Sequence, residues 1–227
     1  MPGRQGGDEV RFRTPGTALT PVTANADGAF VADRVIDELT LRDGERIAVR
    51  PIRPDDSGQL AEMHARLSPD SRYRRYFGLK PSLSADEIRR FTGIAEQWRF
   101  ALVGVRSTGQ LAGVARYEGQ PGRADAEIAL IVDDTLHHQG LGHLLLQRLV
   151  DVARVSGVAS LTAVVLSSNL PMLRLLHALP VPSASAHDAG DVVVTLDLTG
   201  LELPDDRSRI AGDHVAEAAA IRATLGS

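Results

Sequence analysis

One stretch of the chain decides the fold: Ile128-Ala129-Leu130-Ile131-Val132-Asp133-Asp134-Thr135-Leu136-His137-His138-Gln139-Gly140-Leu141-Gly142-His143. An apolar strand pattern enters a glycine-bearing turn, and the turn opens a long helix with its own apolar face. The first amides of a helix have no partner inside it, and together with the positive end of the helix dipole they form an anion site. Gly140 and Gly142 would let a pyrophosphate approach the backbone closely.

The same turn has a plainer explanation, in which a tight strand-to-helix connection needs glycine only for packing. The turn is not a P-loop, because no Gly-Lys-Ser/Thr follows it. It is not a dinucleotide fingerprint either, because Leu145 stands where a third glycine would fall. Taken alone, this Gly-x-Gly is a weak indication of function.

Strand patterns surround the turn. Residues 100–105, 111–117 and 126–132 read as three strands joined by turns around Gly109 and Gly122, which predicts an antiparallel meander. Two further strands are expected at residues 161–166 and 192–198, with a helix over 169–179 between them.

The N-terminal half begins with a strand and two helices. Residues 46–50 alternate like a half-buried strand, and Asp55 with Asp56 can cap the first helix. Ser84 followed by Glu87 is a capping box for the second helix. The whole order of elements predicts an α/β (α+β) fold, a mixed sheet with helices on its faces.

The chain ends differ from this middle part. Residues 1–37 are rich in Gly, Pro, Thr and Ala, which indicates a flexible N-terminal tail. Residues 38–200 form the expected domain. Residues 201–227 are polar and then alanine-rich, which is typical of a C-terminal tail or a short helix.

Composition limits the function classes. The 227 residues carry a net charge of −4 and have a sequence pI of about 6.0, so no overall basic footprint for nucleic acid is present. The chain lacks cysteine, which excludes disulfides, thiolate metal sites and cysteine nucleophiles. No segment approaches the roughly 20 apolar residues of a membrane helix, and no secretory signal is evident. We therefore expect a cytoplasmic protein with neither a membrane nor nucleic acid as partner.

Several segments together resemble one known family. The segment from His137 to Gly142 is similar to the pyrophosphate-binding Gln/Arg-x-x-Gly-x-Gly/Ala turn of GNAT acetyltransferases. Four further segments resemble the catalytic domain of bacterial Pat-type protein lysine acetyltransferases. They are residues 41–54, 67–77, 126–128 and 169–173. The resemblance covers roughly residues 38 to 198. It implies a GNAT fold with a mixed, mostly antiparallel central sheet and helices on both faces, and acetyl-CoA as the acyl donor.

The chain departs from the family pattern at three places. His137 replaces the usual first Gln or Arg of the turn. Leu176 stands where many GNAT enzymes carry a tyrosine as general acid, and Leu179-Pro180-Val181 replaces the usual Leu-Gly-Phe. These departures bear on proton transfer and regulation more than on cofactor binding.

Glu127 is the expected catalytic residue. It lies on the strand before the turn and matches the acidic position that serves as general base in Pat-like enzymes. The alternative is a structural ion pair across the sheet, with Arg116 on the neighbouring strand as its partner.

The resemblance also implies the cofactor contacts. Backbone N–H groups near Ile131 would face the thioester, and Val132 would border the pantetheine arm. Asn169 would bond the pantetheine, or it would only cap a helix. The pyrophosphate would be held by the turn and helix start: His137, His138, Gln139, Gly140, Leu141, Gly142 and His143.

Other polar residues near the turn have weaker predicted roles. Asp133 and Asp134 are expected to be capping or solvated carboxylates, and the leaving thiolate would take its proton from His177 or water. The three histidines of the turn lack a carboxylate-supported ligand pattern, so no metal is expected. The basic-aromatic run 72–77 would either dock an acidic protein or put its tyrosines into the core and its arginines into solvent.

Three functions remain open at this level. The chain acetylates protein lysine with acetyl-CoA, or it acetylates a small amine or antibiotic, or it binds acyl-CoA and regulates a partner without turnover. The oligomeric state is also open, with a homodimer as one option.

Overall fold

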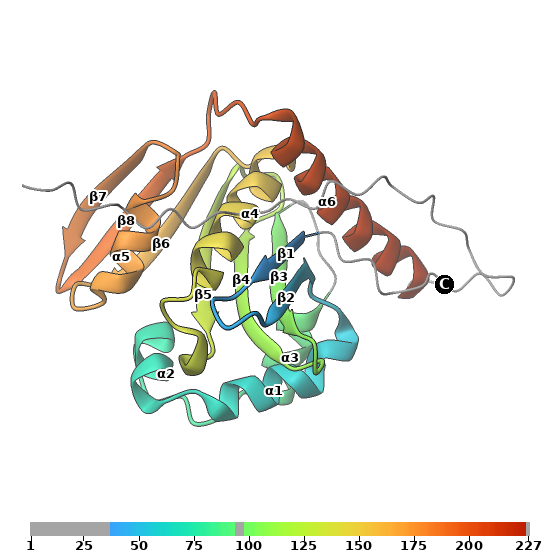
Figure 1. The fold of residues 1–227 in the computed structure, drawn as a ribbon. Helices are drawn as coiled ribbons and strands as arrows, with labels where there is room; N and C mark the ends of the chain where they lie inside the picture. The colour runs from blue at the N-terminus through green and yellow to red at the C-terminus, as the bar shows by residue number, and fades with distance from the viewer. Residues whose placement is uncertain (1–36, 94–97, 226–227) are drawn as a thin grey trace, which may run out of the picture.

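The computed structural model describes residues 37–93 and 98–225, so the tail expected over 1–37 lies outside the described residues except for Asp37. The described part forms one sheet with helices on both faces (Figure 1). The eight strands are β1 (Asp37–Thr40), β2 (Arg46–Pro51), β3 (Arg99–Arg106), β4 (Leu111–Gly119), β5 (Asp125–Val132), β6 (Ser160–Leu166), β7 (Ser183–Asp188) and β8 (Asp191–Asp197).

The strands lie in the order β1-β2-β3-β4-β5-β6-β8-β7. Every neighbouring pair is antiparallel except β5 with β6. The hairpin turns expected in the meander are present, with Gly109 and Gly122 at positive φ. The mixed, mostly antiparallel sheet predicted from the sequence is therefore confirmed.

Two groups of helices cover the two faces. The first group is α1 (Ser57–Arg66), α2 (Pro69–Tyr76) and α3 (Ala85–Thr92), and the second is α4 (Leu141–Val155), α5 (Leu170–His177) and α6 (Asp205–Leu225). Short 3-10 turns, η1 (Pro54–Asp56) and η2 (Asp134–Leu136), precede α1 and α4. In Figure 1 the first group lies at the bottom of the view, α4 crosses in front of the sheet, and α6 lies at the right.

Alternation along the strands separates two hydrophobic cores. On β4, Ala115 and Tyr117 join the larger core with α4, which contains the fully buried Leu145. Val114 points to the other face and joins the smaller core with Leu60 of α1. One face of the sheet is thus packed deeply, and the other carries a thinner layer.

Local sequence signals explain most helix ends. The capping box of Ser84 and Glu87 is present at the start of α3. Gly157 follows α4 with φ +83, as a C-terminal glycine should. Asp56 does not cap α1 with its side chain; its carboxylate instead binds the Arg50 guanidinium at 2.7 and 2.8 Å.

Three elements differ from the expectation. β1 adds an edge strand before the first expected one, and β7 pairs with β8 as an exposed strand at the other edge of the sheet. The C-terminal segment is not a tail or a short helix but the 21-residue α6, which packs against α4. The buried side chains of this helix include Ile210, Ala211 and Ala218.

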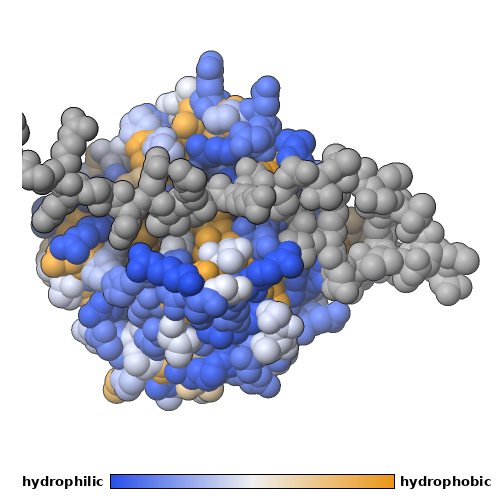
Figure 2. Space-filling model, in the orientation of Figure 1, coloured by the Kyte–Doolittle hydropathy of each residue, from blue (hydrophilic) through white to orange (hydrophobic). Residues whose placement is uncertain are grey.

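The surface shown in Figure 2 is mainly hydrophilic, with apolar residues scattered among charged ones. No helix within the described ranges is long and apolar enough to cross a membrane.

Candidate active site

The site begins where two strands part. β5 pairs with β6 only from Asp125 to Glu127, whereas it pairs with β4 along its whole length to Val132. Residues 128–132 therefore have an open edge toward β6. A cleft of about 580 Å³ occupies this opening and is lined by β5, β6, α2, α5 and the turn before α4.

Backbone amides of β5 face this cleft. The N–H of Asp133 donates to the carbonyl of Ala112 on the β4 side at 2.9 Å. Because hydrogen-bonding direction alternates along an antiparallel strand, the N–H of Ile131 also points to β4. The N–H groups of Leu130 and Val132 then point to the open edge. The amides expected near Ile131 thus belong to its two neighbours.

Two glycines shape the turn for different reasons. Gly140 has φ +92 at the start of α4, a conformation that L side chains rarely adopt. A Cβ added to Gly142 would lie 3.3 Å from Leu130 and 3.4 Å from Leu175, at the floor of the cleft. Close packing therefore explains part of the glycine pattern, and both residues line the cleft where an anion would meet the helix start.

The histidines surround this turn. The Nε2 atom of His137 lies 3.1 Å from the carbonyl oxygen of Val132, and His138 has φ +61. His143 is half-buried, and burial followed by the nearby Arg207 lowers its pKa. All three line the cleft. His143 is therefore mostly neutral at pH 7 and could offer an N–H rather than a full positive charge.

Two predicted turn residues do not line the cleft. Gln139 donates from Nε2 to the Thr135 carbonyl at 3.2 Å, and Leu141 is fully buried near Gly104. Only their backbone could contact a phosphate, since neither side chain is among the cleft residues.

Asp133 and Asp134 fix the turn in place, in agreement with the predicted capping role. Asp133 accepts from the Thr135 N–H at 3.1 Å and pairs with Arg66 of α1 at 3.2 Å. Asp134 accepts from the Ser68 N–H at 2.7 Å and from the Ser71 hydroxyl of α2. Burial alone would raise the pKa of Asp134, but the bonds from Ser71 and Ser68 outweigh it and hold that pKa low.

Glu127 stands at the end of the cleft where the β5–β6 pairing stops. Its side chain is exposed, and within residues 37–93 and 98–225 it makes no ion pair or hydrogen bond. The alternative partner, Arg116, instead binds Glu118 at 2.8 Å. The carboxylate of Glu127 is thus available to a ligand.

The basic-aromatic run follows the expectation of buried tyrosines and solvated arginines only in part. Tyr76 turns inward, with its ring centre 5.5 Å from that of the buried His64, but Tyr73 is 49% exposed. Arg75 also turns inward and lines the cleft beside Glu127. It borders a separate inner cavity of about 30 Å³ under α1, α2 and α3 as well. The sequence does not single out Arg75 within the run, because helical spacing alone does not show which arginine faces the sheet.

The residues on and near α5 divide into two groups. Asn169 lines the cleft, and its Oδ1 accepts from the Met172 N–H at 3.3 Å, so the capping role is confirmed. Leu176 is fully buried. His177 lies 3.0 Å from the Ser185 hydroxyl of β7 and is not among the cleft residues.

The cleft fits an elongated anionic acyl carrier better than a metal. It combines free strand amides, a helix N-terminus without side chains at two positions, and apolar walls from Leu175 and Val165. Within the described chain, no group of three or more His, Cys, Asp or Glu side chains could hold a metal ion.

Comparison with known proteins agrees with this geometry. Residues 46–179 match a family model described as "Acetyltransferase (GNAT) domain". The chain is similar to Acetyltransferase PA5475 of Pseudomonas aeruginosa, with 30% identity over 162 residues, covering 69% of this chain and 86% of the relative.

Solved structures show the same fold. The GNAT domain of S. lividans PAT shares 30% identity with a TM-score of 0.65, covering 70% of this chain and 95% of that domain. A cAMP-binding acyltransferase from Mycobacterium smegmatis is 19% identical with a TM-score of 0.57, and the match covers 81% of this chain but 54% of that protein. The yncA structure from Salmonella typhimurium, described as containing its cofactor acetyl-CoA, is 21% identical with a TM-score of 0.56, covering 70% and 98%.

Proposed function

The chain belongs to the GNAT acetyltransferase family and is an acyltransferase enzyme, and we propose that it transfers the acetyl group of acetyl-CoA to a lysine side chain of a protein. One observation carries the proposal. The exposed carboxylate of Glu127, which has no partner in the part of the chain that the structure describes, lies in the same cleft as the open amides of β5 and the glycine turn of α4.

Glu127 is the proposed general base. An amine must be neutral to attack a thioester, and a lysine with a pKa of about 10.4 is roughly 3.4 units from neutral at pH 7, which costs about 4.6 kcal/mol. A positioned carboxylate, directly or through a water, can take that proton in the cleft. Its open position leaves room for the amine.

The strand amides are the proposed electrostatic stabiliser. The N–H groups of Leu130 and Val132 point to the open edge, where the thioester oxygen would gain charge during attack. Acetyl-CoA supplies the activated acyl group. Attack by the amine is direct, because the chain has no cysteine to hold the acyl group.

Acetyl-CoA binding would use the turn and the cleft walls. The amides at the start of α4, with His137, His138 and His143 around them, would hold the pyrophosphate. Asn169 and the backbone of Val132 would border the pantetheine. With Leu176 buried and His177 turned to Ser185, water in the open cleft is the proposed proton source for the leaving thiol.

Two considerations support a protein lysine as the acceptor. The sequence resembles Pat-type lysine acetyltransferases over roughly residues 38 to 198, and its similarity to the GNAT domain of S. lividans PAT reaches 30% identity. The cleft is also open toward α2, whose end carries the exposed side chains of Tyr73 and Phe77. These apolar groups offer contacts to a segment larger than a small amine.

Glu127→Gln tests the catalytic role. The variant should lose about 10²- to 10⁴-fold in transfer rate while binding acetyl-CoA with unchanged affinity. Release of free CoA measures transfer, and calorimetry measures binding. Glu62→Gln, at an exposed position of α1, is the matched control and should behave like the wild type. Unchanged transfer by Glu127→Gln would remove Glu127 from the mechanism.

Gly142→Glu tests the cofactor site. The new carboxylate would press on Leu130 and Leu175 and repel the pyrophosphate, so acetyl-CoA binding should be lost. A circular dichroism spectrum like that of the wild type would show that the variant is folded. If wild-type protein itself binds no acetyl-CoA in calorimetry, the proposed function is wrong.

A further inference from the structure

The most unusual charge arrangement of the structure lies beside Glu127, on the sheet face covered by α1, α2 and α3. Residues opposite one another on β4 and β5 are Glu118 with Glu127 and Arg116 with Ala129. Since side chains two residues apart share a face, Glu127 and Ala129 face the same side as Arg116. Arg75 descends on this surface from α2.

The guanidinium groups here outnumber the carboxylates. Arg116 and Arg90 both bind Glu118, and Arg116 also lies 4.1 Å from the centre of the Phe91 ring. Arg75 has no hydrogen bond or ion pair within the described ranges. Its guanidinium lies 5.1 Å from the centre of the Tyr76 ring and is attracted by the charge of Glu127 at longer range. Three guanidinium groups therefore share two carboxylates.

Burial strengthens this imbalance. Burial, only partly offset by Tyr76 and Glu127, lowers the pKa of Arg75. Burial, followed by the nearby charge of Arg75, lowers the pKa of Arg116 to about 10. Both guanidinium groups remain charged at pH 7, because arginine is not deprotonated in proteins. Among the described residues, Glu118 and Glu127 therefore leave part of this positive charge unmatched on the acceptor side of the cleft.

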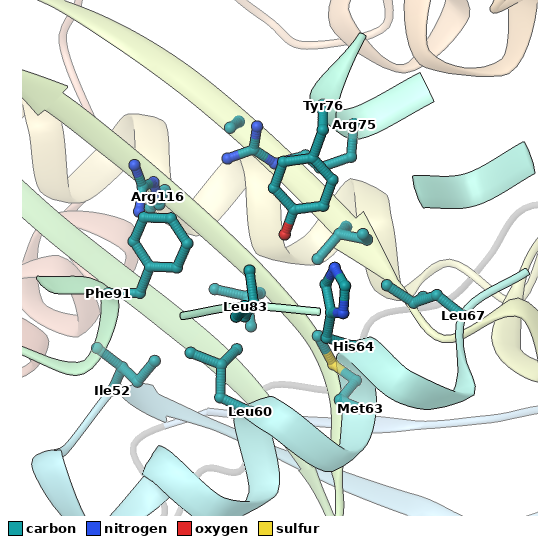
Figure 3. A pocket seen from close by; sticks show the side chains of 13 residues that line it. Ile52, Leu60, Met63, His64, Leu67, Arg75, Tyr76, Leu83, Phe91 and Arg116 are labelled. Carbon is teal, nitrogen blue, oxygen red and sulfur yellow. The ribbon is translucent and has the colours of Figure 1, made fainter. Parts of the chain in front are cut away.

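The inner cavity is too small to hold an acceptor. At about 30 Å³ it has room for a water or two near the unpartnered Nε2 of the buried His64. Figure 3 shows the Arg75 guanidinium extending toward the Arg116 side of this cavity, with Tyr76 beside it. An anion would therefore meet Arg75 where the cavity joins the larger cleft, over Ala129.

We propose that Arg75, backed by Arg116, binds a carboxylate that the acceptor carries a short distance from the amine that is acetylated. This inference rests on the proposed function and names its substrate class. Glu127 and Ala129 are two residues apart on a strand, so the amine and the carboxylate would be roughly 7 Å apart. A guanidinium fork matches a carboxylate geometrically, which an amide or a hydroxyl does not.

Two sources could supply this carboxylate: an acidic side chain next to lysine in a protein, or the α-carboxylate of a free amino acid. Paired acceptors separate the sources. One pair is a lysine peptide flanked by Glu and the same peptide flanked by Gln, and the other is free lysine and its decarboxylated diamine. The wild type should prefer the acidic member of at least one pair by roughly ten- to a hundredfold in kcat/KM.

Arg75→Gln should abolish this preference while leaving kcat/KM for the uncharged member and the affinity for acetyl-CoA nearly unchanged. Arg75→Lys should keep part of the preference, because it retains charge without the fork. Arg72→Gln is the matched control, since Arg72 lies on the same helix, donates to the Pro81 carbonyl at 3.0 Å and lines neither the cleft nor the inner cavity. Equal loss for both members of a pair, or no preference in the wild type, would overturn the inference.

A binding measurement separates this inference from the proposed function. Calorimetry with the N-acetylated Glu-flanked peptide and the N-acetylated free lysine, in the presence of CoA, needs no turnover. The carboxylate site is supported, even if transfer fails, when the wild type binds one of these two ligands and Arg75→Gln binds it at least tenfold more weakly. Transfer without such a difference in binding or rate contradicts the site and leaves the transferase proposal standing.

Discussion

The two faces of the sheet differ in how tightly side chains pack against them. The face under α4 and α6 is filled by fully buried aliphatic side chains such as Leu145 and Leu149. The face under α1, α2 and α3 holds a smaller core, an inner cavity and the buried His64. Protein interiors are normally packed to the density of organic crystals, so the second face is packed less tightly than a normal interior. It is also the face toward which Glu127 and Arg75 project.

The two faces also differ in how completely their charged side chains are paired. Between α4, α6 and β1, Arg148 pairs with Asp37, and Arg207 pairs with Asp151. Under α2 and α3, no carboxylate of residues 37–93 or 98–225 lies within hydrogen-bonding distance of Arg75. Internal pairing stabilises a scaffold, whereas an incompletely matched group retains its affinity for a ligand. The comparison indicates that one face fixes the fold, whereas the other carries the side chains of the proposed reaction.

Asp151→Ala is expected to have the largest effect on this comparison. Asp151 is fully buried, and its loss leaves Arg148 and Arg207 without their shared carboxylate. Breaking such a buried pair should lower the free energy of unfolding by about 3 to 5 kcal/mol, measured by urea denaturation. Glu118→Gln on the opposite face should cost at most about 1 kcal/mol, because its pairs are partly exposed. Equal losses would break the distinction.

Leucine truncation compares the packing of the two faces directly. Leu145→Ala removes a side chain that is 0% exposed in the larger core and should cost roughly 3 kcal/mol. Leu60→Ala lies beside the existing cavity, where neighbours can relax, and should cost roughly 2 kcal/mol. The measurement is again the free energy of unfolding. A larger loss for Leu60→Ala would mean that the thin layer is the better packed one.

His214 is a buried polar residue on the otherwise apolar, well-packed face, and its contribution to stability depends on pH. Burial, followed by the charge of Arg148, lowers the pKa of this histidine to about 3, and neither ring nitrogen has a hydrogen-bond partner among the described residues. As the pH falls, His214 is protonated in the unfolded chain first, because its pKa there is near 6.5. The contribution of His214 to the free energy of unfolding is therefore fully present above about pH 6.5 and is lost as the pH drops below that value.

From pH 6.5 to pH 5 this loss should reach about 2 kcal/mol in the wild type. His214→Phe should make the free energy of unfolding less dependent on pH over the same interval, and urea denaturation at the two pH values measures the difference. An identical slope for both proteins would show that His214 is not the group responsible. The other face supplies a comparison group, because burial also lowers the pKa of His64.

Gly140→Ala should produce the smallest change in stability. With φ +92 the added Cβ strains the backbone by about 1 kcal/mol, although open space surrounds it. The turn should shift, so acetyl-CoA affinity should fall more than stability does; calorimetry and thermal unfolding together measure both. Gly58→Ala, in α1 with open space at its Cβ, is the control and should leave both unchanged or raise stability slightly.

The sequence predicted the elements that depend on local signals. The apolar face of α4, the meander and the capping box at Ser84 are such signals, and each is confirmed. The pairing that ends at Glu127 could be expected only through family resemblance, because no local pattern shows where two strands part. Most of the residues that the resemblance implies for the cofactor line the cleft, but Gln139 and Leu141 do not, and their roles stay predictions.

Other features depend on contacts that no short window contains. Asp56 looked like a helix cap but binds Arg50, since a nearby guanidinium competes for the carboxylate. The length of α6 was missed because its alanines have no strong amphipathic pattern, and contacts with α4 stabilise it. The inward turn of Arg75 depends on how α2 sits on β5, which its own sequence does not encode.

The hydrogen bonds of Asp134 have a mechanical consequence. This single carboxylate joins the start of α2 to the turn that precedes α4. A displacement of α2 by an arriving acceptor is thereby passed to the segment that would hold the donor, and the reverse holds equally. Thermodynamic linkage requires each ligand to change the affinity of the other by the same factor. Donor and acceptor would then not bind independently, and Asp134→Asn would loosen their cooperativity.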